Sequence, residues 1–360
     1  GITHERVWEA VNTSPISADR ALSLGLVDRL GYRDEVYEAC LAEWGLKPEH
    51  LRFVQRWTPR PNLQHSLRPP RDKVAVVSLR GGIVTGRGAA GPGGQQAGSD
   101  VVDEHLRACL RDDAIKAVVF EIESGGGSAV ASDFIRRAVL RVKNSGRPVV
   151  ARMGKVAASG GYYSAKGANE IVAQPSTLTG SIGVVAGKFV SRGLFEKLAV
   201  KREPIRIGAR AGLLSGASEF SPEDWEKLDE ILDRVYDDFT RFAAADRGME
   251  LAELEQLARG RVWTGADAKR HGLIDHLGGW HVAYQRACSL AGLDPDRARM
   301  VHVGRLGPLE KLLPANSSES RSSAASLSST TGEELLMRAA AWLGVPIHGA
   351  LSLPFQIEIR

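Results

Sequence analysis

Two glycine-rich segments of this sequence combine residue types that can carry out nucleophilic chemistry. The first is Glu123–Ser128 (ESGGGS) and the second is Met153–Tyr163 (MGKVAASGGYY), and each lies between an apolar run and a helical pattern. Backbone N–H groups at such a strand-to-helix turn suit a phosphate or an oxyanion. Ser159 is flanked by small residues, so its hydroxyl can reach a cleft as at a nucleophile elbow, with the Gly160 amide beside it. The alternatives are a plain tight turn for the first segment and a helix-capping serine for the second.

Other binding chemistries fit these segments less well. A dinucleotide site needs Gly-x-Gly-x-x-Gly and an acidic residue about 20 residues further on, and a P-loop needs Gly-Lys-Ser/Thr; neither pattern is present. The three cysteines, Cys40, Cys109 and Cys288, are far apart, which excludes a disulfide framework and a cysteine metal site. No histidine lies in the glycine-rich segments, so a Ser-His-Asp triad is not expected. We expect no cofactor and no metal.

A third segment, Gln174–Val184, contains Thr-Gly-Ser-Ile-Gly and makes the pattern more specific. Gly125–Ser128, Ala158–Tyr163 and Thr179–Gly183, in this order and at close spacing, resemble the signal peptide peptidase A (protease IV) family of serine peptidases. Downstream, Gly260–Gly265 and Gly272–Asp275 are similar to the same family.

This resemblance implies a ClpP/crotonase-like α/β fold and a serine endopeptidase with a Ser–Lys dyad. By residue, it implies Ser159 as the nucleophile, Gly126 and the Gly160 amide as the oxyanion hole with Gly127 beside them, and Ser181 as the hydroxyl that orients the lysine. It further implies cleaved signal peptides as substrates. The expected assembly is a membrane-associated homo-oligomer, a tetramer, whose catalytic part faces the periplasm or the cell exterior.

Two departures from the family pattern bear on the mechanism. Gly125 stands where the family often has proline, and Ala211 stands where the short, single-copy form carries its base lysine. Lys155, Lys166 and Lys188 are the other lysines near the motifs, and we expect each to be a solvated surface charge. A crotonase-like acyl-CoA enzyme and an inactive structural or peptide-binding homologue therefore remain alternative functions.

An internal repeat offers another source for the lysine. Ser17–Gly31 aligns without gaps with Thr264–Gly278 at a constant offset of 247 residues (272 − 25), matching Gly25, Leu26 and Asp28 to their counterparts. The repeat predicts the tandem form of the family, truncated at its N-terminus, with most of a first copy and a membrane-contacting segment upstream of Gly1. We expect a first-copy tail at 1–58, a linker at 59–72, a complete peptidase copy at 73–314, and a Ser-rich linker and tail at 315–360.

The composition fits such a folded chain. Its 360 residues are 43% hydrophobic and 25% charged, with a net charge of +4 and no basic block, which is unlike a nucleic-acid binder. No run of 18 apolar residues is present.

The elements expected to position the motifs alternate between strands and helices. Buried strands are predicted at 74–79, 117–122, 148–152 and 171–173, helices at 34–43, 100–111 and 128–143, and a mobile loop at 81–98. Apolar strands separated by helices predict a largely parallel sheet built from βαβ units. A long helix should begin at Ser221, and its apolar stripe from Trp225 to Phe242 should pack in the fold or against another subunit.

Overall fold

The computed structural model describes residues 2–14, 16–47, 72–88, 90–91, 94–199, 207–303 and 351–352. The chain forms two compact units: the first comprises Gly1–Leu51 and Ala186–Arg234, and the second comprises Arg52–Val185 and Val235–Arg360. Most of the predicted linker at 59–72, and all of the Ser-rich segment except residues 351–352, lie outside the described residues.

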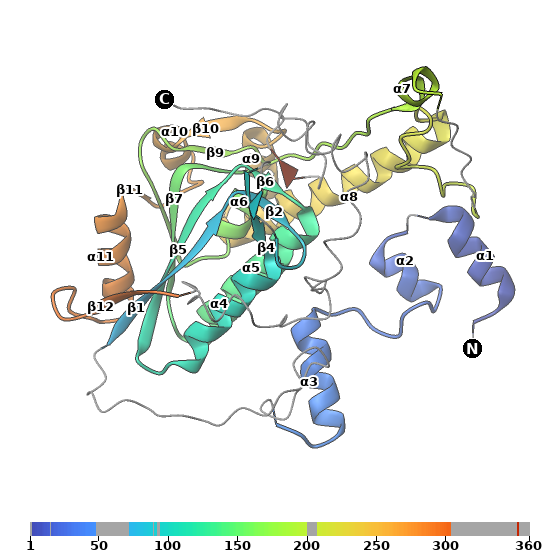
Figure 1. Ribbon diagram of the computed structural model, residues 1–360. Coiled ribbons are helices and arrows are strands. Elements are labelled where there is room, and N and C mark those ends of the chain that lie inside the picture. The colour runs from blue at the N-terminus through green and yellow to red at the C-terminus, as the bar shows by residue number, and fades with distance from the viewer. Residues whose placement is uncertain are drawn as a thin grey trace. The chain divides into compact units, whose positions relative to one another are not determined.

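The second unit is built on a mostly parallel sheet (Figure 1). Its strand order is β10-β9-β7-β5-β1-β12, with β8 pairing with β7 and β11 with β8. Among the strand pairs that the described residues form in this sheet, β9–β10 is the antiparallel one. The strands are β1 (Lys73–Arg80), β5 (Ile115–Ser124), β7 (Val149–Ala158), β8 (Glu170–Ala173), β9 (Leu178–Gly180), β10 (Val262–Thr264), β11 (His276–Leu277) and β12 (Arg299–His302). The predicted mixed α/β fold with a parallel sheet is confirmed.

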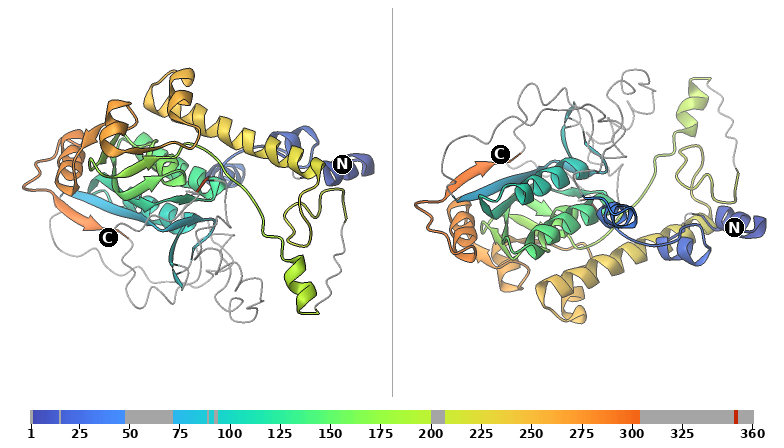
Figure 2. Two further views of the ribbon diagram at one scale, coloured as in Figure 1. Left: turned by 90° about the horizontal axis from the view of Figure 1, so that it is seen from above. Right: turned by 90° about the horizontal axis from the view of Figure 1, so that it is seen from below.

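Helices cover both faces of this sheet (Figure 2). On one face lie α4 (Ser99–Arg111), α5 (Ala129–Asn144), α6 (Gly160–Ala165) and the later part of α8 (Pro222–Arg247), and on the other lies α11 (Trp280–Leu290). Phe120 of β5 and Phe239 of α8 are fully buried in the larger of the two cores. Because both faces are covered, the central strands are continuous apolar runs, as in other parallel sheets.

A second, small sheet lies beside the first glycine-rich segment. Its order is β13-β6-β2-β4-β3, from β2 (Gly82–Val84), β3 (Ala90–Gly91), β4 (Gly94–Gly98), β6 (Gly126–Gly127) and β13 (Leu351–Ser352). The predicted mobile loop at 81–98 was therefore wrong: much of it is paired strand. Short strands whose partners are distant in sequence leave no local periodicity to detect.

The two halves of the internal repeat have the same local structure. The helices α2 (Ala18–Ser23) and α10 (Gly265–Arg270) both have six residues, and α3 (Arg33–Glu43) and α11 both have eleven. Each pair starts at residues that the repeat aligns. Gly25, with φ 74°, and Gly272, with φ 72°, end the two short helices in the same left-handed conformation. The helices α1 (His4–Thr13) and α9 (Leu251–Leu257) precede them.

The helix α8 begins as predicted. The Ser221 hydroxyl accepts a bond from the Asp224 N–H at 3.1 Å, and the Asp224 carboxylate accepts one from the Ser221 N–H, also at 3.1 Å. Leu228 and Phe239 of the apolar stripe are buried, which confirms that the stripe packs, although Trp225 is 50% exposed and rests against Phe220. The remaining described helix is α7 (Arg192–Lys197).

Candidate active site

Ser159 lies at the junction between β7 and α6. Its backbone has φ 52° and ψ −118°, a conformation that non-glycine residues rarely adopt and that costs about 1–3 kcal/mol. The side chain is fully buried, and its hydroxyl has no hydrogen-bond partner among the described residues. Ser159 occupies the N-cap position without making a side-chain capping bond. The capping alternative is therefore wrong, whereas a strained turn that aims the hydroxyl inward is typical of a nucleophile elbow.

Ser181 lies beside Ser159 because of the strand register. Ala158 of β7 pairs with Gly180 of β9, so the two serines are the next residues at the ends of adjacent parallel strands. The Ser159 N–H donates to the Gly180 carbonyl at 2.9 Å, and the Ser181 N–H donates to the Arg261 carbonyl at 2.7 Å. Ser181 also has a positive φ, 48°. Four described non-glycine residues share this conformation, and the two predicted serines are among them.

The glycine turn after β5 packs directly on the start of α6. A Cβ on Gly160 would lie 2.5 Å from Ser132 Oγ, 3.2 Å from Gly126 Cα and 3.2 Å from Gly127 N. A Cβ on Gly161 would lie 2.6 Å from the Ser124 carbonyl oxygen. The structure thus brings Gly126 and Gly127 together with Gly160, and only glycine allows this approach.

The backbone amides of these glycines have different partners. The Gly126 N–H donates to Ser124 Oγ at 3.1 Å, and that hydroxyl donates to the Gly81 carbonyl at 2.7 Å. Gly160 opens α6, where the first N–H groups of a helix have no partner within the helix. The Gly126 amide can therefore serve an oxyanion only by giving up its bond to Ser124.

The three lysines near the motifs lie in different surroundings. Lys155 is exposed on β7, as expected. Lys188 donates to the Leu213 carbonyl at 2.9 Å. The prediction that Lys166 is a solvated surface charge was wrong: it is fully buried, and its Nζ lies 3.1 Å from Asp246 Oδ2. Burial lowers the pKa of Lys166 to about 7, although the Asp246 carboxylate opposes this shift.

Sequence reasoning missed several residues that shape the site. Ser124 and Ser132 hold or contact the glycine turn, and Asp246 reaches Lys166 from the end of α8. Ser124 lies within the first glycine-rich segment, but its hydroxyl bonds to the Gly81 carbonyl, 43 positions away in the chain. Asp246 is 80 positions from Lys166, and no local spacing indicates that pair.

The edge of β6 is occupied by the chain itself. Leu351 and Ser352 pair in antiparallel fashion with Gly127 and Gly126, on a strand that also pairs with Ile83 of β2. An extended peptide can therefore add to the strand that holds the glycine turn, which is a common mode of peptide recognition.

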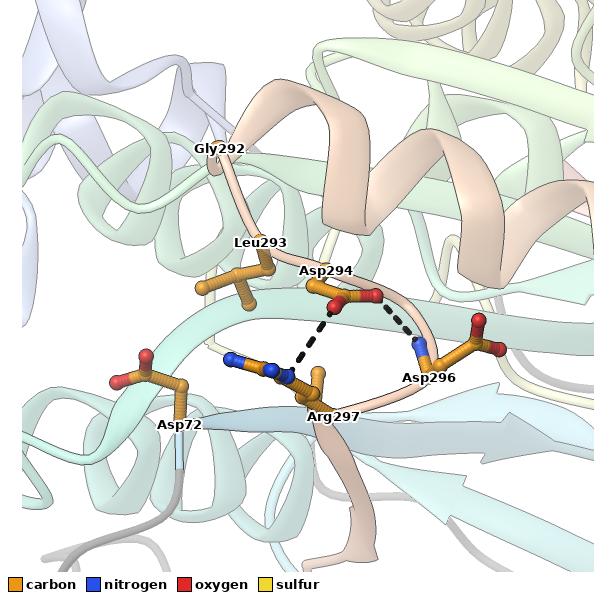
Figure 3. A pocket seen from close by; sticks show the side chains of 7 residues that line it. Asp72, Gly292, Leu293, Asp294, Asp296 and Arg297 are labelled. Atoms are coloured by element: carbon orange, nitrogen blue, oxygen red, sulfur yellow. Dashed lines mark hydrogen bonds and ion pairs between the residues drawn. The ribbon is translucent and has the colours of Figure 1, made fainter.

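A surface cavity of about 540 Å³ lies elsewhere, around Asp72, Asp294 and Arg297 (Figure 3). Asp72 precedes β1, so this cavity is at the opposite end of the parallel strands from Ser159. Over the described residues, the structure contains no helix that combines the length and apolar composition needed to cross a membrane.

Comparison with known proteins places this geometry in a family. The family model "Peptidase family S49" matches residues 141–294, which include both predicted serines. The chain is 34% identical to the chloroplastic serine protease SPPA of Arabidopsis thaliana over 78% of its length and 42% of that protein. It is 31% identical to Protease 4 of Salmonella typhi over 83% of its length and 49% of that protein.

A shorter relative is covered almost completely. A putative protease of Synechocystis is 32% identical over 72% of this chain and 89% of its own length. The chain spans less than half of the Arabidopsis and Salmonella proteins. The strained, buried serine at the end of a parallel strand is accordingly found in a chain that belongs to peptidase family S49, a family of serine-type endopeptidases.

Proposed function

We propose that this chain carries the nucleophile of a serine endopeptidase that uses a Ser–Lys dyad. The observation that carries the proposal is Ser159, a buried serine on a strained turn whose hydroxyl has no hydrogen-bond partner within the described residues. It directly precedes Gly160, and its strand is adjacent to the strand that ends before Ser181. A serine hydroxyl becomes a nucleophile only when a neighbouring base accepts its proton.

The reaction follows from these positions. Ser159 Oγ attacks the carbonyl carbon of the scissile bond while a neutral lysine amine takes its proton. The resulting oxyanion receives backbone N–H donors from Gly160 and from the glycine turn. The intermediate then collapses to an acyl-enzyme as the lysine returns the proton to the leaving amine, and water hydrolyses the ester. Ser181 orients the lysine amine through its hydroxyl.

The glycine turn offers two candidate donors beside the Gly160 amide. The Gly126 N–H is bonded to Ser124 Oγ, and Gly127 pairs with Leu351 at the edge of β6. Gly126 and Gly160 are the proposed oxyanion donors, with Gly127 beside them, and an amide of the turn can bind the oxyanion once its present partner leaves. Each donor of this kind contributes about 3–4 kcal/mol to transition-state stabilisation.

The base lysine is supplied by a preceding copy of the repeat. In the second copy, Leu273 and Ile274 are buried in the core, whereas their first-copy counterparts Leu26 and Val27 are each 40% exposed. These apolar side chains lack the sheet on which their counterparts pack, which supports a first copy with residues 1–58 as its tail. The peptidase copy then extends from 73 to 314, followed by a linker and tail at 315–360.

The substrates are peptides, and cleaved signal peptides at the membrane are the proposed class. Pairing of Leu351–Ser352 with β6 supports binding of an extended peptide backbone. Large apolar side chains are exposed on the first unit: Trp44 (71%), Leu214 (70%), Ile207 (69%) and Leu198 (61%). Exposed apolar side chains of this kind support the proposed self-association into a homo-oligomer and the proposed contact with a membrane.

Labelling with a fluorophosphonate probe tests the nucleophile. The gene product that includes the preceding copy should be labelled, and Ser159→Ala should abolish labelling, with Ser145→Ala, on the surface-facing end of α5, as the matched control. Absence of labelling would favour an inactive peptide-binding homologue, which the Ala211 substitution also suggests. Labelling that survives in Ser159→Ala would place the nucleophile elsewhere.

A further inference from the structure

A buried cluster of charges lies behind the proposed site, on the face of the sheet covered by α5, α6 and α8. Asp246 accepts two bonds from Arg136, from Nε and from Nη2, both at 2.7 Å, and a third from Lys166 Nζ at 3.1 Å. The Arg136 guanidinium lies over the Phe242 ring, and Lys166 Nζ lies 4.2 Å from the centre of the Tyr163 ring. One carboxylate thus holds two cations in an apolar setting.

The two cations belong to the two helices that begin at the site. Arg136 is on α5, whose cap, Ser128, directly follows Gly127. Lys166 caps the end of α6, which starts directly after Ser159. Arg136 lies about two helical turns after Ser128, and Lys166 lies about two helical turns after Ser159. Asp246 therefore bridges the helix that follows the glycine turn to the helix that follows the nucleophile.

The contact between these helices at the site leaves little tolerance. Gly160 packs against Ser132, Gly126 and Gly127 so closely that it has no room for a Cβ. A small slide of α6 along α5 would change the distance between Ser159 and the oxyanion glycines while leaving each helix intact. Because catalysis depends steeply on such distances, a displacement of about 1 Å can cost on the order of 100-fold in rate.

We propose that Asp246 is a positioning residue: by holding Arg136 and Lys166 together, it fixes the nucleophile helix relative to the oxyanion turn. This proposal rests on the proposed function of Ser159 and the glycines. The contacts of Asp246 with Arg136 and Lys166 are observed independently of that function. Lys166 is accordingly a structural member of this bridge, bonded to Asp246 through its amine, and not the catalytic base.

The test compares Asp246→Asn with Asp103→Asn. Asp103 is a matched control because its carboxylate also holds two arginines at 2.8 Å, Arg107 and Arg141, and ties α4 to α5 without reaching α6. In the peptidase that includes the preceding copy, Asp246→Asn should lower kcat about tenfold or more with KM changed less than about twofold. Asp103→Asn should leave both unchanged, and Asp246→Glu should recover part of the loss.

Hydrogen exchange on the 360-residue chain gives a readout that does not need activity. Asp246→Asn should speed exchange in peptides covering both Ser124–Ser128 and Ser159–Tyr163, and Asp103→Asn should speed neither. If Asp246→Asn does not fold, Lys166→Met keeps the Arg136 pair and should speed exchange at Ser159–Tyr163 alone. Unchanged exchange at Ser159–Tyr163, or an unchanged kcat in folded Asp246→Asn, would overturn the proposal. Full activity of Ser159→Ala would instead overturn the proposed function, while the exchange result would still decide the bridge.

Discussion

Substituting Gly160 with alanine perturbs the proposed site at its tightest contact while keeping the backbone N–H. The new Cβ would lie 2.5 Å from Ser132 Oγ, so that hydroxyl must rotate away from the Ser128 carbonyl, to which it now donates at 2.8 Å. Losing this bond costs about 1 kcal/mol. The contacts of 3.2 Å with Gly126 and Gly127 then require a shift of a few tenths of an ångström.

The opposing effects can be weighed. Alanine is better than glycine in a helix interior by about 1 kcal/mol, and only part of this gain applies to Gly160 because it is the first residue of α6. Overpacking costs about 1–3 kcal/mol. We therefore expect a net loss of stability of about 1–4 kcal/mol. The rate should also fall, by about 10- to 100-fold, because the displaced groups are the nucleophile turn and the oxyanion donors.

The assay measures kcat on a fluorogenic peptide together with the melting temperature, in the peptidase that includes the preceding copy. Gly193→Ala is the matched control, because a Cβ there would meet nothing within 4 Å. Adding Ser132→Ala to Gly160→Ala removes the shortest contact and should restore part of kcat. A Gly160→Ala enzyme with wild-type kcat would refute the view that the Gly160 contacts set the geometry of the site.

Three further predictions follow from the site. Residues 1–360 alone should be inert as a peptidase. Adding the preceding copy should give activity that depends on Ser159 and that rises with pH as one lysine of that copy becomes neutral. Ser159-dependent proteolysis by the isolated chain would contradict this prediction. The pKa of Lys166 is lowered from 10.5 to about 7 on folding, so between these pH values the unfolded state binds more protons than the folded state. The free energy of unfolding should therefore rise with pH in this window, by up to about 1.4 kcal/mol per pH unit, relative to that of Lys166→Met. Parallel curves of unfolding free energy against pH for the two proteins, measured by urea unfolding, would disprove this prediction. In the peptidase that includes the preceding copy, ending the chain before Leu351 frees an edge of β6 and should increase the rate of peptide cleavage. An unchanged rate would mean that substrates do not pair with this edge.

The parts of the site that the sequence predicted are those set by local backbone geometry. Ser159, Ser181 and the glycines each follow a buried strand, and the parallel register then brings the strand ends together. The turns directly after these strands need small residues because larger side chains would not fit there, so runs of glycine and serine mark the turns in the sequence. The α/β class was predictable for the same reason, since alternating apolar runs and helices leave few other arrangements.

The parts that the sequence did not predict depend on contacts between distant segments. Lys166 resembles a surface lysine at the end of a short helix until Asp246 and Phe242 of α8 cover it. The strands β2 and β4 lie in a glycine-rich stretch and pair with each other. Ile83 of β2 also pairs with Gly127 of β6, more than 40 positions further along the chain. Burial of a charge and pairing of short strands are properties of the assembled fold, and neither leaves a periodic signal.

Ser159 carries two energetic costs at once, and together they argue for a partner beyond the described residues. Its positive φ costs about 1–3 kcal/mol. Its buried hydroxyl, which has no hydrogen-bond partner in the described part of the chain, costs about 1–3 kcal/mol more. Alanine at this position would remove the cost of the buried hydroxyl, and glycine would remove both costs, so packing alone does not explain serine here. A neutral amine placed against Ser159 and Ser181 would accept the hydroxyl proton and remove the second cost. The same amine would be the base that the reaction needs, so the proposed lysine of a preceding copy would account for both the geometry and the chemistry of this site.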